Sequence, residues 1–294
     1  MIATRDRPEK IPRAVASVLA NDHPAFDLTV VDQSSTDATQ SALRELAGTD
    51  PRLHLLHVTE TGLSRARNTG IRASTGSIIA FTDDDCIVPD RWIADIVRAF
   101  DSDRDGQLLY GCVAPLPDED NPYLTPFLKI ETVERLSRTD GFRVIGMGAN
   151  FAARRRLFDA IGGFDERLGC GGPLCAGEDF DFAYRTYRSG AVILLRPDVS
   201  LLHDGRRERS DWPGLVRNYG IGDGAFYSKH IRCGDLRAMQ MLSGRVARMG
   251  TRVAAKRIIG QWTDEDSYLR GLLTGVKEGL RFRVDRRSRQ YVTR

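Results

Sequence analysis

The chain of 294 residues is 41% hydrophobic and 28% charged, an ordinary composition that suits one large α/β domain with an appendage or two small domains. Its net charge of +3 hides an asymmetry, because residues 1–204 carry 23 Lys and Arg against 31 Asp and Glu, whereas residues 205–294 carry 20 against 9. No run approaches the roughly 18 apolar residues of a membrane span, and the polar first residues do not resemble a signal peptide.

Short apolar runs alternate with helix-like segments through the first hundred residues. The predicted strands are residues 1–4, 28–31, 53–58 and 78–81. The predicted helices begin near Pro8, after Asp37, at Gly62 and at Pro89. Strand, polar turn and helix in repeated order predict an α/β fold with a doubly wound, mostly parallel sheet.

Three consecutive carboxylates, Asp83, Asp84 and Asp85, follow the predicted strand at 78–81. This position is the carboxyl end of a buried strand, where open α/β sheets bind their ligands. Like charges this close repel one another unless something positive neutralises them. A solvated acidic turn is the simple alternative. The buried strand before the turn and the amphipathic segment after it favour a hard divalent cation that also binds phosphates.

Two common nucleotide-binding motifs are missing from the sequence. No Gly-x-Gly-x-x-Gly follows the first strand, and no Gly-x-x-x-x-Gly-Lys occurs anywhere. The sequence therefore argues against a dinucleotide fold and a P-loop. Instead, the predicted strands end in hydroxyls, carboxylates or amides, which suit the base and ribose of a nucleotide.

After about residue 105 the alternation becomes less regular. The expected order is a strand at 107–113, a proline-rich loop at 115–122, a helix at 123–138, a strand at 144–152, a short helix after residue 156, a glycine-rich loop at 167–177, a helix opening at Glu178, and strands at 191–195 and 199–202. The last of these strands ends at His203.

Eight short motifs occur in an order that resembles family-2 glycosyltransferases, which have the GT-A fold. They are Thr-Arg-Asp-Arg-Pro (4–8), Val-Val-Asp-Gln-Ser-Ser-Thr-Asp (30–37), Gly-Leu-Ser-Arg-Ala-Arg-Asn-Thr-Gly-Ile (62–71), Thr-Asp-Asp-Asp (82–85), Gly-Ala-Asn-Phe (148–151), Gly-Gly-Phe-Asp-Glu (162–166), Gly-Glu-Asp-Phe-Asp (177–181) and His203. Each motif alone is weak, but their order is specific. The resemblance covers roughly residues 1–204.

The resemblance implies transfer of a sugar from a nucleoside-diphosphate donor, with a UDP-sugar favoured, to an acceptor hydroxyl with inversion at the anomeric carbon. It implies Asp85 and His203 as ligands of Mn²⁺ or Mg²⁺. The residues that it implies for binding the nucleotide sugar are Thr4, Asp32, Arg67, Asp83 and Asp84. Many members carry Asn-Asp or Asp-Asp where this chain has Asp32-Gln33, so the identity of the base stays open.

The chemistry of such a transfer needs a cation and a base. A metal held by carboxylates stabilises the negative charge that grows on a departing nucleoside diphosphate. A base must take the proton of the acceptor hydroxyl, and Asp179 is our first candidate, with Glu178 or Asp181 as alternatives. An acid at a helix start can also be a simple N-cap.

Residues 205–294 form a basic extension that we expect to be mainly helical. Apolar residues recur at spacings of three and four over 236–253 and 269–280, with arginines between them. Two helices that pack on the catalytic domain or on a second subunit are one interpretation. A basic amphipathic surface on an anionic membrane is the other. Sparse aromatics argue against binding of nucleic acid.

We therefore predict a metal-dependent inverting glycosyltransferase that acts on a glycan or lipid-linked acceptor, such as a polysaccharide or glycolipid precursor. The predicted units are residues 1–105 for the nucleotide, 106–204 for acceptor and catalysis, and 205–294 for the extension. The alternatives are a nucleotidyltransferase and an inactive scaffold that binds sugar nucleotides. Five cysteines without a compact framework predict a cytoplasmic setting, either free or peripheral on the cytoplasmic face of the membrane. A homo-oligomer stays open.

Overall fold

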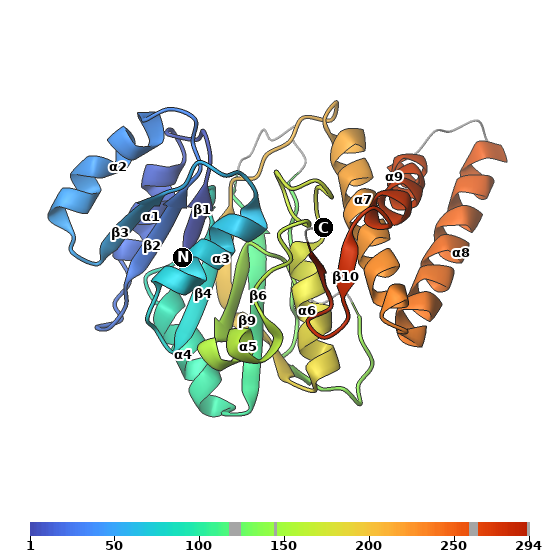
Figure 1. Cartoon of the computed structure of the whole chain (residues 1–294). Coiled ribbons are helices and arrows are strands. Elements are labelled where there is room, and N and C mark those ends of the chain that lie inside the picture. The colour runs from blue at the N-terminus through green and yellow to red at the C-terminus, as the bar shows by residue number, and fades with distance from the viewer. Residues whose placement is uncertain (118–124, 144–145, 259–263, 293–294) are drawn as a thin grey trace.

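A nine-stranded mixed sheet forms the centre of the molecule in the computed structural model, which describes residues 1–117, 125–143, 146–258 and 264–292 (Figure 1). The strands lie in the order β3-β2-β1-β4-β8-β6-β9-β5, and β7 pairs with β9 outside this path. Their bounds are β1 Ile2–Thr4, β2 Leu28–Asp32, β3 Leu53–His57, β4 Ile78–Asp83, β5 Cys86–Ile87, β6 Gly106–Pro115, β7 Glu134–Leu136, β8 Asn150–Arg154 and β9 Val192–His203.

Helices cover both faces of this sheet. In the first two thirds of the chain they are α1 Ile11–Leu19, α2 Ala38–Thr49, α3 Leu63–Ala73, α4 Trp92–Ser102, α5 Arg155–Ile161 and α6 Glu178–Ser189. The alternation expected for the first hundred residues is confirmed. The expected short helix is confirmed as well, but it begins at Arg155 rather than after residue 156. The predicted mostly parallel α/β sheet is confirmed as well, with β8 running antiparallel between β4 and β6.

Parallel pairing brings the polar ends of the first strands to one edge of the sheet. Thr4 of β1 is in register with Asp32 of β2, and Ala3 lies beside Asp83 of β4. Because parallel strands end at the same edge, residues that are far apart in sequence become neighbours there. The candidate site is built on this edge.

Two apolar layers hold the helices to the sheet. On one face, α1 and α4 bury residues such as Val15 and Trp92. On the other face, α3, α5 and α6 pack around stacked aromatics, with the Phe81 and Phe151 rings 4.4 Å apart. Alternate residues of each strand face the two layers, so both faces of the central strands are buried.

Three predicted elements of the second half differ from the structure. The helix expected at 123–138 is wrong for the described residues 125–138, because Leu128 bridges to Val113 and β7 pairs with β9 as an edge strand. Pro126 and several β-branched residues favour this extended backbone. The two strands expected at 191–195 and 199–202 form the single strand β9, with an irregularity opposite residues 111–112.

The remaining expectations in this region are borne out in part. The strand expected at 144–152 begins at Asn150 and runs to Arg154, while residues 144 and 145 lie outside the described residues. Residues 118–122 of the loop expected at 115–122 also lie outside the described residues. The glycine-rich stretch at 167–177 is a loop before α6, as predicted.

The C-terminal part contains more structure than the two helices expected from its sequence. It comprises α7 Trp212–Arg232, α8 Leu236–Ile258 and α9 Asp264–Gly279, followed by a hairpin of β10 Arg283–Asp285 and β11 Gln290–Val292. Figure 1 shows these helices at the end of the molecule farthest from β3, with α8 outermost. Among the described residues, no helix has the length and hydropathy that a membrane span requires. The domain boundary at residue 204 stays a prediction.

Helices α7 and α9 cross at close range through glycines from both. A Cβ at Gly275 of α9 would collide with the backbone carbonyl of Ile221 in α7, whereas a Cβ at Gly244 of α8 would meet no atom within 4 Å. We therefore expect Gly275→Ala to lower the free energy of unfolding by about 1–3 kcal/mol through overpacking. The matched control Gly244→Ala should raise it by up to about 1 kcal/mol, because alanine is the better helix former. Equal effects in urea denaturation would contradict the close crossing.

Candidate active site

Two of the carboxylates after β4 are held by side chains from the segment that follows β1. Arg7 Nη1 lies 2.7 Å from Asp84 Oδ1 and 2.9 Å from Asp85 Oδ2. Thr4 Oγ1 donates a hydrogen bond of 2.7 Å to Asp84 Oδ2. Burial raises the pKa of Asp84, and the charge of Arg7 opposes that rise. Arg7 thus offsets part of the repulsion within the acidic turn.

The other side of the acidic turn faces the end of β9. His203 Nε2 lies 3.3 Å from Asp85 Oδ1, and the ligand atoms of Asp85, Cys86 and His203 all lie within 4.8 Å of one another. The imidazole Nδ1 lies 3.2 Å from the Pro126 carbonyl oxygen. With a proton on Nδ1 donated to this carbonyl, a neutral His203 would present its Nε2 lone pair to a cation, as metal-binding histidines usually do.

This donor set fits a divalent cation of the oxygen-preferring kind. Asp85 offers a carboxylate oxygen, which suits Mn²⁺ and Mg²⁺, and His203 offers an imidazole nitrogen, which suits transition metals. Burial raises the pKa of the Cys86 thiol well above its ordinary value, so this third group stays protonated and is a poor ligand. The predicted ligands Asp85 and His203 lie close together because Asp85 directly precedes β5, and β5 pairs with the end of β9.

Asp85 and His203 shift each other's protonation. Burial alone would raise the pKa of Asp85, but the hydrogen bond and charge of His203, together with Arg7, hold it well below its usual range. Burial alone would lower the pKa of His203, but Asp85 outweighs burial and raises it. Asp85 is thus ionised at neutral pH, which is the state that binds a cation.

Arg67 of α3 connects the acidic turn to the first turn of α6. The guanidinium is buried, and its Nη1 donates to Glu178 Oε1 at 2.9 Å. Its Nη2 lies 3.4 Å from Asp83 Oδ1 and donates to the Gly148 carbonyl at 3.0 Å. Burial raises the pKa of Asp83 to about 6, although the charge of Arg67 opposes the rise. Arg67 is thus a structural bridge between three segments at the site.

Asp179 lies beside this bridge and is only partly buried. Its Oδ2 accepts a hydrogen bond of 2.9 Å from Gly148 N, and its Oδ1 accepts one of 2.7 Å from Phe180 N. Glu178, the neighbouring candidate, is buried and ion-paired with Arg67. Asp181, the third candidate, is fully buried and points into the protein interior. Among the three acids, Asp179 has the carboxylate that is accessible to a substrate.

Asp32 at the end of β2 presents a buried oxygen to the same edge of the sheet. Its Oδ1 accepts a hydrogen bond of 2.9 Å from Ser34 N. Its Oδ2 lies 3.5 Å from His57 Nδ1 and accepts no hydrogen bond within the described part of the chain. The neighbouring Gln33 is engaged with the backbone of residues 60 and 62. Asp32 Oδ2 can therefore accept a further hydrogen bond, since buried polar atoms are normally hydrogen-bonded.

The structure brings most of the predicted site residues together. It also places two further residues, Arg7 and Gly148, in contact with them. Thr4, Asp32, Arg67, Asp83, Asp84, Asp85, Glu178, Asp179 and His203 lie around the carboxyl edge of the sheet. Arg7 and Gly148 were not assigned a role from the sequence. Arg7 lies in the first recognised motif, where a cation among acids was the available signal. The role of Gly148 depends on its backbone N–H and carbonyl, which residue identity does not reveal.

A family model described as Glycosyl transferase family 2 matches residues 1–162, which is more than half of the chain. The matched part contains β1 to β4 and the acidic turn at 83–85, and it stops after α5. Glu178, Asp179 and His203 therefore lie beyond the matched residues.

Individual proteins resemble the chain over a longer stretch. The pre-mycofactocin glycosyltransferase of Mycobacterium tuberculosis is 26% identical over 221 residues, which are 73% of this chain and 44% of that protein. The chain thus spans less than half the length of this relative. The structure of mannosyltransferase PcManGT from Pyrobaculum calidifontis, in complex with GDP-Man and Mn²⁺, matches 95% of this chain and 85% of its own, with a TM-score of 0.62 and 20% identity.

S. aureus TarS 1-349 in complex with UDP-GlcNAc matches 76% of this chain and 65% of its own, with a TM-score of 0.57 and 17% identity. Both structural likenesses concern the fold. They confirm the predicted GT-A-type sheet with its flanking helices.

The buried carboxyl group of Glu178 should make the free energy of unfolding depend on pH. Burial raises the pKa of Glu178 to about 7, with Asp179 adding to the rise and Arg67 opposing it. An unfolded glutamate has a pKa of about 4.3, so the unfolded state loses this proton first as the pH rises. Through this group, the free energy of unfolding should fall between about pH 4.5 and pH 7.

Urea denaturation at several pH values in this range tests the effect. Glu178→Gln should reduce the fall in the free energy of unfolding, because a glutamine has no proton to lose. Glu60→Gln, at an exposed position, is the matched control and should keep the wild-type slope. An unchanged slope in Glu178→Gln would assign the pH dependence to other groups.

Proposed function

Because the chain belongs to glycosyl transferase family 2, we propose that it moves a sugar from a nucleoside-diphosphate sugar to an acceptor hydroxyl, with inversion at the anomeric carbon. The observation that carries the proposal is the arrangement around Arg67. The side chain of Arg67 contacts both Asp83, at the edge proposed for the donor, and Glu178 at the start of α6. A donor bound at the acidic turn would therefore meet the accessible carboxylate of Asp179.

The nucleoside would occupy the ends of β1 and β2. Asp32 Oδ2 supports this placement, because a base N–H or a ribose hydroxyl would satisfy a buried acceptor. We favour a UDP-sugar as donor, with GDP-mannose as the main competitor, since the structural neighbours TarS and PcManGT were solved with UDP-GlcNAc and GDP-Man. Thr4, Arg67, Asp83 and Asp84 would shape the rest of the pocket.

The diphosphate would lie against the acidic turn, where Asp85 and His203 would hold Mn²⁺ or Mg²⁺. A bound cation would supply positive charge to the departing diphosphate. Arg7 contacts both Asp84 and Asp85, and its partly exposed guanidinium can also donate to a phosphate oxygen. The chain's own residues thus orient the leaving group toward the edge of the sheet.

Asp179 would act as the general base. Its carboxylate takes the proton of the acceptor hydroxyl while the hydroxyl oxygen forms a bond to the anomeric carbon. The bond from that carbon to the diphosphate oxygen breaks, and its electron pair leaves with the nucleoside diphosphate. Gly148 N and Phe180 N, which donate to Asp179, fix the orientation of the carboxylate. Attack from the side opposite the leaving group inverts the anomeric carbon.

Binding and turnover of UDP-N-acetylglucosamine and GDP-mannose test this proposal. With Mn²⁺, one of these donors should raise the melting temperature of the wild type, because a ligand of the folded state stabilises it by mass action. Asp85→Ala should abolish that rise, and removal of Mn²⁺ by chelation should do the same. Asp179→Asn should keep the rise and lower the release of nucleoside diphosphate at least about 100-fold.

Asp159→Asn, an exposed position on α5, is the matched control and should behave as the wild type. Unchanged turnover in Asp179→Asn would remove this residue from the role of base. Binding without turnover, for any acceptor and for water, would favour a scaffold that binds sugar nucleotides. No binding by either donor would overturn the assignment of these two donors.

For the acceptor we propose a glycan or lipid-linked precursor at an anionic membrane surface, which α8 would contact. Leu242, Met249 and Val253 of this helix pack inward. Its outer face, defined as Leu236, Met239, Val246 and Ile258, is 70%, 47%, 43% and 85% exposed. The same helix also carries exposed arginines at 248 and 252. A helix with exposed apolar residues and exposed cations is suited to the interface of an anionic bilayer.

Co-sedimentation with vesicles tests the membrane contact. The wild type should sediment with phosphatidylglycerol vesicles, less so at high salt, and should stay in the supernatant with phosphatidylcholine vesicles. The double variant Arg248→Glu, Arg252→Glu should lose binding, whereas Arg44→Glu on exposed α2 should retain it. A wild type that stays in the supernatant throughout would leave the outer face of α8 to a second copy of the chain.

A further inference from the structure

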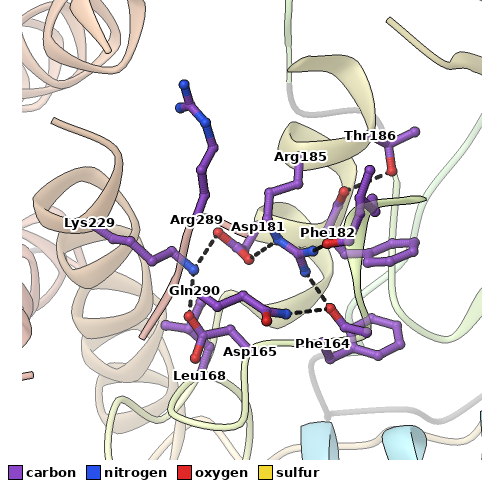
Figure 2. Close-up of polar contacts among 12 residues, drawn as sticks. Phe164, Asp165, Leu168, Asp181, Phe182, Arg185, Thr186, Lys229, Arg289 and Gln290 are labelled. Carbon is purple, nitrogen blue, oxygen red and sulfur yellow. Dashed lines mark hydrogen bonds and ion pairs between the residues drawn. The ribbon is translucent and has the colours of Figure 1, made fainter. Parts of the chain in front are cut away.

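A buried group of charges joins α6 to the C-terminal part of the chain (Figure 2). We call it the Lys229 cluster and define it as Lys229, Asp165, Asp181, Arg185 and His230. Lys229 Nζ lies 2.6 Å from Asp165 Oδ2 and 2.7 Å from Asp181 Oδ1, and all three side chains are fully buried. A lysine that looks like part of a basic surface in the sequence is thus one of the least exposed residues of the protein.

The cluster continues into the turn that follows α5. Arg185 Nε donates to Asp181 Oδ2 at 2.8 Å, and its two terminal nitrogens donate to the carbonyls of Ile161 and Gly163 at 2.8 and 2.7 Å. Every nitrogen of this guanidinium therefore has an acceptor. Arg185 holds the turn at 161–163 against the inner side of α6.

The C-terminal hairpin completes the cluster. The backbone N–H of Tyr291 donates to Asp165 Oδ2 at 2.8 Å, and the Gln290 side chain donates to the Gly163 carbonyl at 2.7 Å. Tyr291 Oη donates to the Ala225 carbonyl of α7 at 2.6 Å. Residues from the last strand thus contact the same turn and the same carboxylate as Lys229.

The charges of the cluster balance one another. Asp165 and Asp181 face Lys229 and Arg185, while burial lowers the pKa of His230 to about 4 and keeps it neutral at pH 7. The neutral ring places Nε2 2.8 Å from Asp181 Oδ1. Burial alone would raise the pKa of Asp181, but Lys229 and Arg185 hold it far below its usual range. Loss of one partner would leave a buried charge uncompensated.

The cluster lies directly behind the accessible carboxylate of the candidate site. Asp181 is in the first turn of α6, two residues after Asp179. A second contact lies at the start of the same helix, where the backbone of Gly177 meets that of Gly222 in α7 so closely that a Cβ on Gly222 would overlap Ala176. The first turn of α6 is therefore fixed from inside by Lys229 and at its start by the α7 backbone.

We propose that Lys229 is a positioning residue that sets the first turn of α6 for the transfer reaction, and that the C-terminal hairpin supports it. The inference rests on the proposed function, in which Asp179 is the base. A shift of this turn by about 1 Å would move the carboxylate away from the acceptor hydroxyl, and such a shift can cost about 100-fold in rate. Binding of the donor, which depends on β1, β2 and the acidic turn, would change little.

Two Lys229 variants separate positioning from folding. Lys229→Met removes the cation and leaves two buried carboxylates facing Arg185 alone, so this variant can fail to fold. The double variant Lys229→Met, Asp165→Asn removes one charge of each sign and keeps Asp181 paired with Arg185. Lys256→Met is the matched control, because Lys256 also pairs with a carboxylate, that of Glu265, but at a partly exposed position.

The readouts are kcat and the donor dissociation constant with Mn²⁺ and either UDP-N-acetylglucosamine or GDP-mannose, together with hydrogen exchange of the backbone amides at 179–182. In the double variant we expect kcat to fall at least about tenfold and the dissociation constant to stay within about twofold. The amides at 179–182 should exchange faster than in the wild type. Lys256→Met should match the wild type in all three.

The outcomes distinguish this inference from the proposed function. A folded double variant with wild-type kcat would overturn the positioning role. A fall in kcat with unchanged exchange at 179–182, or with an equal loss of donor binding, would overturn it as well. A wild type without turnover, in which the double variant still exchanges faster at these amides, would contradict the proposed function and retain the structural support by Lys229.

Discussion

The repulsion among the carboxylates at the end of β4 is the constraint on which the site depends. Three acids on one turn require positive groups around them, and the fold supplies these from distant segments. Arg7 comes from the residues after β1, Arg67 from α3 and His203 from the end of β9. Each of these groups also fixes a segment at the edge of the sheet. The groups that offset the repulsion within one turn thus also bring the segments of the site together.

A second layer of charge lies behind the first. Arg67 contacts Glu178, and three residues further along α6 the side chain of Asp181 contacts Lys229. The first turn of α6 is therefore held by two cations, Arg67 from α3 and Lys229 from α7. Both are buried, so neither pair is weakened by salt as a surface ion pair would be. The same turn thus carries the candidate base Asp179 and the two ion-paired acids that hold it in place.

Local patterns predicted the first half of the fold and most of the candidate site. Apolar runs followed by polar turns are readable one segment at a time, and parallel pairing places their ends together. The helix expected at 123–138 was wrong for the described residues 125–138, because pairing with β9 and the fixed backbone of Pro126 favour an extended chain there. Lys229 was missed for a related reason. Its partners Asp165 and Asp181 lie 64 and 48 positions away, and a lysine in a basic segment resembles any solvated one.

The hairpin of β10 and β11 is synthesised after the other parts of the Lys229 cluster. Tyr291 contacts Asp165 across 126 positions of sequence. A nascent chain that has all eight recognised motifs but has not reached β11 lacks the last contact of the Lys229 cluster. The edge of the sheet can then form while the first turn of α6 is still incompletely held. On the proposed function, donor binding would then become possible before catalysis during synthesis.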